Sequence, residues 1–130
     1  MNVGSKTILI VEDNEKNMKL VRDILRHKGY ATIEAVTGGE GVSLASERRP
    51  DLILMDIQLP DMNGIEALRR IREDPALDVV AVIAVSASVM PDDQQKIVAS
   101  GFDAFVTKPI NLKQFVETVQ RFLQNGRARR

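Results

Sequence analysis

Five short apolar runs alternate with five segments of helical periodicity, and this alternation constrains the fold more than any other feature of the sequence. The apolar runs, which we expect to be strands, lie near residues 6–11, 30–36, 51–56, 79–85 and 103–107. The helices are expected near 14–27, 38–48, 63–73, 91–99 and 111–124. Strict alternation of strand and helix is typical of an α/β fold with a parallel sheet. A chain of 130 residues is the size of one such domain.

The composition of the strand-like runs indicates their order in the sheet. The first, third and fourth runs are almost wholly apolar, as strands covered on both faces must be. The second run contains Thr32 and Glu34, and the fifth is short, so we expect both at the edges. These features predict a doubly wound five-stranded parallel sheet in the order 2-1-3-4-5. Right-handed crossovers then place the five helices on both faces.

The fourth helix has the weakest signals for tertiary packing. Ser88 is expected to cap it, and Pro91 suits its first turn. Its apolar stripe is thin and consists mainly of Ile97 and Val98. We therefore expect this helix to be the most loosely held of the five.

Polar residues stand at the ends of the runs that the predicted order brings together. Glu12 and Asp13 follow the first run, Asp56 ends the third, Ser86 follows the fourth and Lys108 follows the fifth. Open parallel sheets bind ligands at the carboxyl ends of their strands, near the switch in strand order. Grouped carboxylates suit a hard divalent cation, and a lysine beside them suits a phosphoryl group.

Each of these residues also has an ordinary structural explanation. Asp13 or Asn14 could cap the first helix, Glu12 could be a solvated carboxylate, and Ser86 could be a satisfied hydroxyl at a strand end. The presence of Asp56 and Lys108 at matching strand ends favours a functional site over these alternatives.

The composition excludes several classes of function. The chain has no cysteine, which excludes disulfides, thiolate metal sites and cysteine nucleophiles. Its formal net charge is zero and no helix is uniformly basic, so nucleic acid is not an expected partner. The longest apolar stretch, which begins at Val79, is too short to cross a bilayer, and no signal peptide is visible. We expect a cytoplasmic protein without a membrane partner.

Four segments, VEDNEKNMKL, DLILMDIQLPDMNG, VIAVSAS and GFDAFVTKPI, resemble the receiver domains of two-component response regulators. The resemblance extends over essentially the whole chain, and the four motifs in this order are highly specific. It is strongest to stand-alone receivers of the DivK type, with CheY-like receivers more distant. It implies a CheY-like, flavodoxin-like fold with a receiver domain at 1–125. The basic residues near the end of the chain lead us to expect a solvated C-terminal tail at 126–130 and no output domain.

The resemblance also implies a role for each polar residue at the strand ends. Asp56 would be the phosphoacceptor, and Lys108 would pair with the phosphoryl group. Mg²⁺ would be held by Asp13, Asp56 and the main-chain carbonyl of Gln58, with Glu12 acting mainly through water. These roles fit a reaction that needs positioning and charge neutralisation more than covalent help from the protein.

Two further residues would carry the signal away from the acceptor. Ser86 would bind a phosphoryl oxygen, and Phe105 would be a rotating aromatic switch, with a cis peptide at Lys108-Pro109. Ser86 stands where threonine is frequent in the family and keeps the hydroxyl without the methyl group. Phe105 stands where tyrosine is frequent, so an output that relies on a phenol hydrogen bond is in doubt.

We therefore expect a single-domain response regulator rather than an enzyme. It would take a phosphoryl group from a sensor histidine kinase or histidine phosphotransfer protein and assist its own phosphorylation and dephosphorylation. It would bind a downstream protein through the face formed by the fourth helix, fifth strand and fifth helix. Gln58 and Ser88 could tune the access of water to the site and hence the lifetime of the phosphorylated state.

Two alternatives remain open at this point. The chain could be a metal-dependent phosphohydrolase with an aspartate nucleophile. Such enzymes typically carry a second acid two residues after the nucleophile, where this chain has Gln58. It could instead be a receiver that acts only as an unphosphorylated binding platform, and the intact acids, hydroxyl and lysine argue against that reading.

Overall fold

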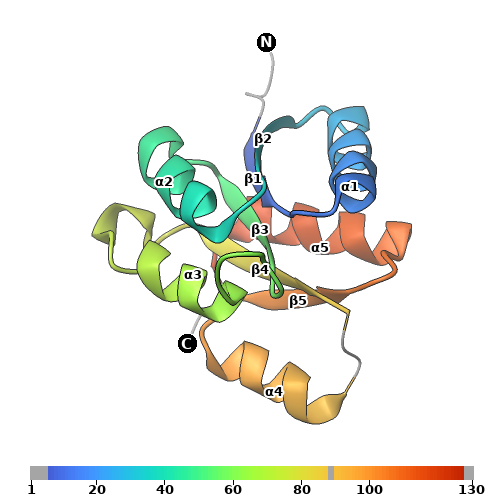
Figure 1. Ribbon diagram of the computed structural model, residues 1–130. Helices are drawn as coiled ribbons and strands as arrows, with labels where there is room; N and C mark the ends of the chain where they lie inside the picture. Colours follow the sequence, from blue (N-terminus) through green and yellow to red (C-terminus); the bar gives the residue numbers. More distant parts are fainter. Residues whose placement is uncertain (1–5, 88–89, 128–130) are drawn as a thin grey trace.

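The computed structural model describes residues 6–87 and 90–127, along which strands and α-helices alternate as predicted (Figure 1). The strands are β1 (Thr7–Val11), β2 (Ala31–Ala35), β3 (Leu52–Asp56), β4 (Ala81–Ser86) and β5 (Ala104–Thr107). The helices are α1 (Glu15–His27), α2 (Gly38–Arg48), α3 (Gly64–Ile71), the 3₁₀ helix η1 (Pro75–Leu77), α4 (Pro91–Ala99) and α5 (Leu112–Asn125). Within the described residues, none of these helices has the length and apolar character needed to cross a membrane.

The strands form one parallel sheet in the order β2-β1-β3-β4-β5, which confirms the predicted order. The buried strands β1 and β3 lie side by side near the centre, where Val11 pairs with Met55. On the other side of β3, Asp56 pairs with Val85 of β4. Because parallel strands all end on the same side, the residues at these strand ends meet along one border of the sheet. We call this border the carboxyl edge, and the opposite border the amino edge.

Alternate residues of the central strands point to opposite faces, and each face is covered by its own helices. Ile8 and Ile10 of β1 pack in a core layer with residues of α1 and α5. Leu9 and Val11 pack in a second layer with residues of α2, α3 and α4, on the other side of the sheet (Figure 1). Burial on both faces explains why the central strands are continuous apolar runs in the sequence.

The segment between α3 and β4 differs from the sequence prediction. Helix α3 ends at Ile71, earlier than expected, and Pro75 begins a 3₁₀ turn that was not predicted. The residue before a proline is disfavoured in the α region, and Asp74 is extended and caps the turn with its side chain. Strand β4 begins at Ala81, and Val79, which we placed in this strand, is 78% exposed.

Helix α4 begins at Pro91 as predicted, with Met90 at the N-cap position, and the side chain of this N-cap residue makes no capping hydrogen bond. Ser88, which we expected to cap it, lies outside the described residues. All residues of α4 are described, and Ile97 is the buried one among them. Val98 is 53% exposed, so its predicted place on the buried stripe is wrong. The apolar stripe of this helix is even thinner than the sequence indicated.

A buried carboxylate at the amino edge of the sheet binds a strand amide and two arginines. The side chain of Asp103, just before β5, is 1% exposed and accepts a hydrogen bond from the Val82 N–H at 2.9 Å. Arg72 and Arg127 both pair with it, at 3.2 and 3.3 Å. Arg127 also donates to the main-chain oxygen of Asp78 at 2.9 Å. We expected Arg127 in a solvated tail, and this part of the prediction is wrong because the residue is bound to the domain.

The C-terminal end of the domain is only partly described. Helix α5 ends at Asn125, and residues 128–130 of the expected basic tail lie outside the described residues. The expected domain boundary at residue 125 stays a prediction.

Candidate functional site

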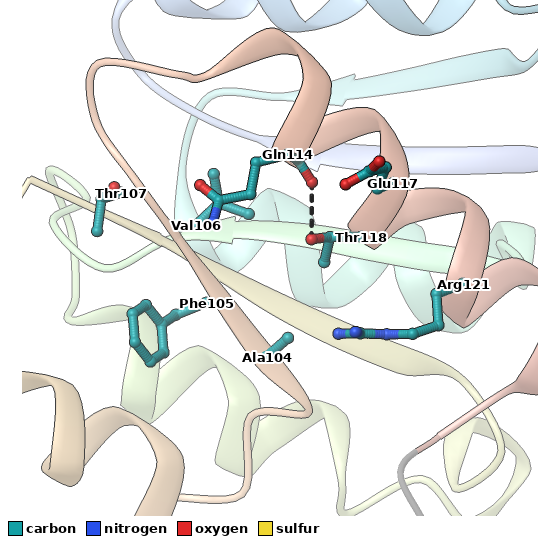
Figure 2. Close-up of a pocket in the computed structure, with 8 residues that line it drawn as sticks. All are labelled: Ala104, Phe105, Val106, Thr107, Gln114, Glu117, Thr118 and Arg121. Atoms are coloured by element: carbon teal, nitrogen blue, oxygen red, sulfur yellow. Dashed lines mark hydrogen bonds between the residues drawn. The ribbon is translucent and has the colours of Figure 1, made fainter.

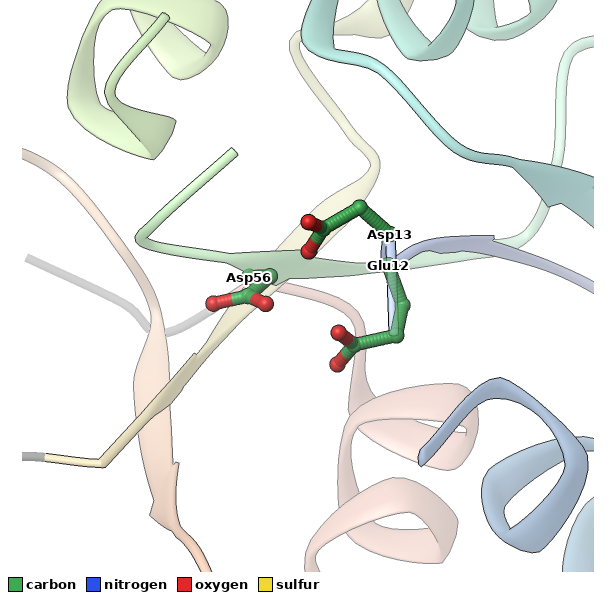
Figure 3. A group of neighbouring side chains, drawn as sticks. All are labelled: Glu12, Asp13 and Asp56. Carbon is green, nitrogen blue, oxygen red and sulfur yellow. The ribbon is translucent and has the colours of Figure 1, made fainter. Parts of the chain in front are cut away.

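Three acidic side chains come together at the carboxyl edge. Glu12 and Asp13 follow the last residue of β1, and Asp56 is the last residue of the neighbouring β3. Each offers a carboxylate oxygen, and these oxygens all lie within 4.8 Å of one another (Figure 3). Glu12 and Asp56 are buried, whereas Asp13 is exposed. A compact set of oxygen ligands with one side open to solvent is compatible with Mg²⁺.

Lys108, just beyond β5, places a positive charge between two of these acids. Its Nζ lies 3.0 Å from Oδ2 of Asp56 and 3.2 Å from Oε1 of Glu12. Burial by itself lowers the pKa of Lys108, but the hydrogen bonds and charges of Asp56 and Glu12 outweigh it, and the pKa is raised. The ammonium is therefore held in its charged form beside the predicted acceptor, as an anion-binding role requires.

The environment of Glu12 shows how crowded the negative charge is. Burial raises its pKa above the ordinary 4.5, and the neighbouring Asp56 raises it further. The N–H of Asn14 donates to Oε2 of Glu12 at 3.1 Å and acts in the opposite direction, as does Lys108. A divalent cation at this place would relieve the same crowding that raises the pKa.

The loop between β3 and α3, residues 57–63, is closed at its base and holds the carboxylate of Asp56. The N–H of Gln58 donates to Oδ1 of Asp56 at 3.0 Å. The N–H of Gly64 donates to the oxygen of Ile57 at 2.7 Å, and Gln58 forms an antiparallel bridge with Asn63. A Cβ on Gly64 would lie 2.5 Å from the main-chain oxygen of Asp56, so this close approach requires glycine. The two oxygens of Asp56 are thus held by different groups, an amide and an ammonium.

The two residues expected to relay a signal lie on the adjacent strands. Ser86 is buried at the end of β4, next to Val85, which pairs with Asp56. Its main-chain oxygen accepts a hydrogen bond from the Lys108 N–H at 2.9 Å, which ties β4 to the end of β5. Phe105 on β5 is partly buried and packs against the core layer that α4 helps to cover. The peptide bond between Lys108 and Pro109 is cis, as the resemblance implied.

A cavity of about 410 Å³ lies beside β5, between this strand and α5 (Figure 2). All four residues of β5 line it together with polar side chains of α5. Among these, the hydroxyl of Thr118 donates to the main-chain oxygen of Gln114 at 2.8 Å. The cavity forms part of the face that we predicted for a downstream partner.

The structure therefore brings Glu12, Asp13, Asp56 and Lys108 together, and it places Ser86 and Gln58 on the segments adjoining Asp56. One residue of this region was missed by the sequence analysis. Asp61, at the tip of the loop 57–63, binds the start of α2 through both carboxylate oxygens. No local sequence signal indicates this contact, because its partners lie 22 and 23 residues away.

Comparison with known proteins agrees with this geometry. Residues 8–120 match the model of the response regulator receiver domain family. The chain is 47% identical over 118 residues to the polar-differentiation response regulator DivK of Brucella anthropi, covering 91% of this chain and 96% of that protein.

Solved structures show the same fold. A CheY-like receiver domain from Methanospirillum hungatei superposes with a TM-score of 0.83 at 30% identity, covering 94% of this chain and 96% of that one. The receiver domain of the sensor histidine kinase PA1611 from Pseudomonas aeruginosa gives a TM-score of 0.86 at 30% identity, with 93% and 99% coverage. That receiver is described with a magnesium ion coordinated in its active-site cleft.

The family match covers most of the chain, and neither it nor the relatives support the phosphohydrolase alternative. Fold, acidic cluster and family model agree on a signalling module with histidine kinases or phosphotransfer proteins as its general class of partner. The chain belongs to the receiver domain family of two-component response regulators.

Proposed function

We propose that this receiver accepts a phosphoryl group on Asp56 from a sensor histidine kinase or a histidine phosphotransfer protein, with the help of Mg²⁺. The observation that carries the proposal is the setting of Asp56. Its carboxylate is buried beside a charged Lys108 and lies in a cluster of three acids. In the family that this chain belongs to, such a setting suits an aspartyl acceptor, and the raised pKa of Lys108 keeps its ammonium charged.

The proposed reaction is an in-line displacement at phosphorus. An oxygen of Asp56 forms a new P–O bond while the P–N bond of the donor phosphohistidine breaks and the electron pair returns to the imidazole. The Gln58 N–H and the Lys108 ammonium hold the carboxylate in place before the transfer. After the transfer Lys108 can pair with the phosphoryl oxygens instead, because its flexible side chain ends in a compact charge. The protein thereby assists its own phosphorylation by positioning and charge neutralisation.

The residues at the carboxyl edge fit a bound Mg²⁺. Asp13, Asp56 and the main-chain carbonyl of Gln58 would hold it, and Glu12 would contribute mainly through water. The ion would supply positive charge that neutralises the transferring phosphoryl group. The support for this assignment is that carboxylate oxygens of Glu12, Asp13 and Asp56 lie within 4.8 Å of one another, and Mg²⁺ prefers oxygen ligands.

The test of the acceptor is incubation of the protein with acetyl phosphate and Mg²⁺, followed by intact-mass and peptide mass spectrometry. The wild type should gain one phosphoryl group on Asp56, and Asp56→Asn should gain none. Asp51→Asn is a matched control because Asp51 is an exposed carboxylate at the amino edge that accepts from the Thr7 N–H at 2.8 Å. A wild type that gains no mass would favour the binding-platform alternative, and phosphate on another residue would overturn the assignment.

We also propose how the phosphorylated state reaches a partner. Phosphoryl on Asp56 would draw the Ser86 hydroxyl toward the site, and Phe105 would turn into the space that this movement leaves. The face formed by α4, β5 and α5 would then change its population of conformations rather than its fold. The thin packing of α4, where Ile97 is the buried residue, supports a low-cost rearrangement at this place.

Ser86→Ala separates acceptance of the phosphoryl group from its relay. The variant keeps the acceptor and the proposed metal ligands, so it should still be phosphorylated on Asp56. NMR spectra of wild type and Ser86→Ala, each with beryllofluoride as the phosphoryl mimic, should differ across α4 and β5. Equal large shifts in both proteins would show that Ser86 is not the coupling group.

We also propose a cytoplasmic location for the protein, because the proposed phosphoryl donor would depend on an ATP-using kinase.

A further inference from the structure

The tip of the loop 57–63 is bound to the N-terminus of helix α2. Asp61 accepts hydrogen bonds from the N–H of Gly38 at 2.8 Å and of Gly39 at 2.9 Å, one with each carboxylate oxygen. These are the first two residues of α2, whose N–H groups have no partner within the helix. The bonds from Gly39 and Gly38 lower the pKa of Asp61, so the carboxylate is charged, and the helix dipole favours that charge.

The start of α2 also has capping contacts from its own sequence. The side chain of Thr37 accepts from the Glu40 N–H at 3.1 Å, and the Glu40 carboxylate accepts from the Val36 N–H at 2.9 Å. This pair resembles a capping box supplied by the helix's own sequence, except that Glu40 reaches the N–H of Val36, one residue before the N-cap. The contact of Asp61 comes from a different element and binds two further N–H groups of the first turn, so it ties the loop 57–63 to the helix.

The absence of a side chain at the start of α2 allows the loop to approach the helix closely. A Cβ on Gly38 would lie 2.5 Å from Cγ and 2.8 Å from Sδ of Met62, the residue next to Asp61. Glycine at position 38 therefore lets two consecutive loop residues rest on the helix. The tip of the loop is held by this contact and by the paired hydrogen bonds of Asp61, while its base is closed by Ile57 and Gly64.

Gln58 lies between the closed base and the clamped tip. Its N–H donates to Asp56, and its main-chain carbonyl is the one assigned above to Mg²⁺. A carbonyl on an exposed loop can hold a metal tightly only when the loop is already in place, because ordering it on binding would cost affinity.

We propose that Asp61 is a positioning residue for phosphoryl transfer. Its clamp on α2 fixes the loop 57–63 so that Gln58 presents its carbonyl to Mg²⁺ and its N–H to Asp56. This inference rests on the function proposed above. Partners beyond the direct ligands of a metal typically change its affinity by about 10- to 100-fold, and we expect the lower end because Asp61 acts through a loop.

The test is an Mg²⁺ titration of the protein without phosphodonor, followed by the amide NMR signals of the carboxyl edge. Asp61→Ala should raise the half-saturating Mg²⁺ concentration by roughly tenfold. Asp61→Asn, which keeps one acceptor oxygen, should give a smaller rise. Amide hydrogen exchange at Gln58 and Gly64 in the Mg²⁺-free protein should accelerate in Asp61→Ala. Phosphorylation by acetyl phosphate should recover most of its wild-type rate at saturating Mg²⁺.

Thr37→Val is the matched control, because it removes the helix's own cap and leaves the clamp in place. It should lower the melting temperature without changing the Mg²⁺ titration. The inference is overturned if Asp61→Ala and Asp61→Asn titrate like the wild type, or if Thr37→Val weakens Mg²⁺ binding as much as they do. A wild type that does not respond to Mg²⁺ at all would instead overturn the proposed function.

Discussion

Asp56→Asn should stabilise the metal-free protein, or at least leave it no less stable, even though it removes an ion pair. The variant loses the pairing of Asp56 with Lys108 at 3.0 Å, worth about 5 kcal/mol at an effective dielectric constant of about 20. It also loses the repulsion from the buried Glu12, whose oxygen lies within 4.8 Å, worth about 3 kcal/mol. Asp13 is exposed and contributes about 1 kcal/mol more repulsion, since water screens it.

The lost attraction to Lys108 and the lost repulsion from Glu12 and Asp13 nearly cancel. The desolvation of Asp56 therefore decides whether Asp56→Asn raises or lowers the stability. A buried carboxylate has an effective desolvation penalty of several kcal/mol, which a neutral amide does not carry. The Asn side chain can still accept from the Gln58 N–H, and Lys108 keeps Glu12 at 3.2 Å. We therefore expect a gain of about 1 to 3 kcal/mol without Mg²⁺. For a domain of this size each kcal/mol corresponds to about 4 °C in melting temperature.

The assay is thermal unfolding of wild type and Asp56→Asn, each with EDTA and with millimolar Mg²⁺. The wild type should gain stability from Mg²⁺, because an ion that binds only the folded form stabilises it by mass action. The variant should gain much less, since a proposed ligand is gone. Asp51→Asn controls for the loss of one negative charge. A variant that melts clearly below the wild type in EDTA, with an unaffected control, would refute the reasoning about charge crowding.

Three further predictions concern the metal, pH and the amino edge. Asp13→Asn should strongly reduce the rise in melting temperature that Mg²⁺ causes, and an undiminished rise would remove Asp13 from the ligand set. Burial and the neighbouring Asp56 raise the pKa of Glu12 above 4.5, so the Glu12 carboxyl binds its proton more tightly in the folded state than in the unfolded chain. Without Mg²⁺ the unfolding free energy should therefore fall as pH rises above 4.5 through the raised pKa, and Glu12→Gln should flatten that part of the profile. Asp103→Ala leaves two arginines without their buried partner and should cost about 3 to 5 kcal/mol in urea unfolding; a loss within experimental error would contradict this.

The strand order and the carboxyl edge could be predicted because they depend on repeating local patterns. Wholly apolar runs identify strands buried on both faces, and the residue after each run is then fixed at one edge by the parallel arrangement. Asp56 and Lys108 are 52 residues apart in the chain, yet their meeting follows from the order of the strands alone.

The contacts that the sequence did not predict depend on single side chains from distant segments. Asp61 reaches residues 22 and 23 positions away, and Asp103 pairs with arginines 31 and 24 positions away. Neither contact has a spacing that distinguishes it from an ordinary solvated charge. Val98 shows the opposite error: its apolar side chain suggested burial, but it is 53% exposed on α4.

The separation of the two sheet edges also determines how the protein can be attached to a sensor surface. The chain has no cysteine, so a single introduced thiol would be its only one. Val79 is 78% exposed at the amino edge, near the pairing of Asp103 with Arg127. A Val79→Cys protein coupled through that thiol would present the acidic cluster outward, toward the solution. Every immobilised molecule would then have the same orientation, and a kinase or other partner passed over the surface would meet the acceptor unobstructed.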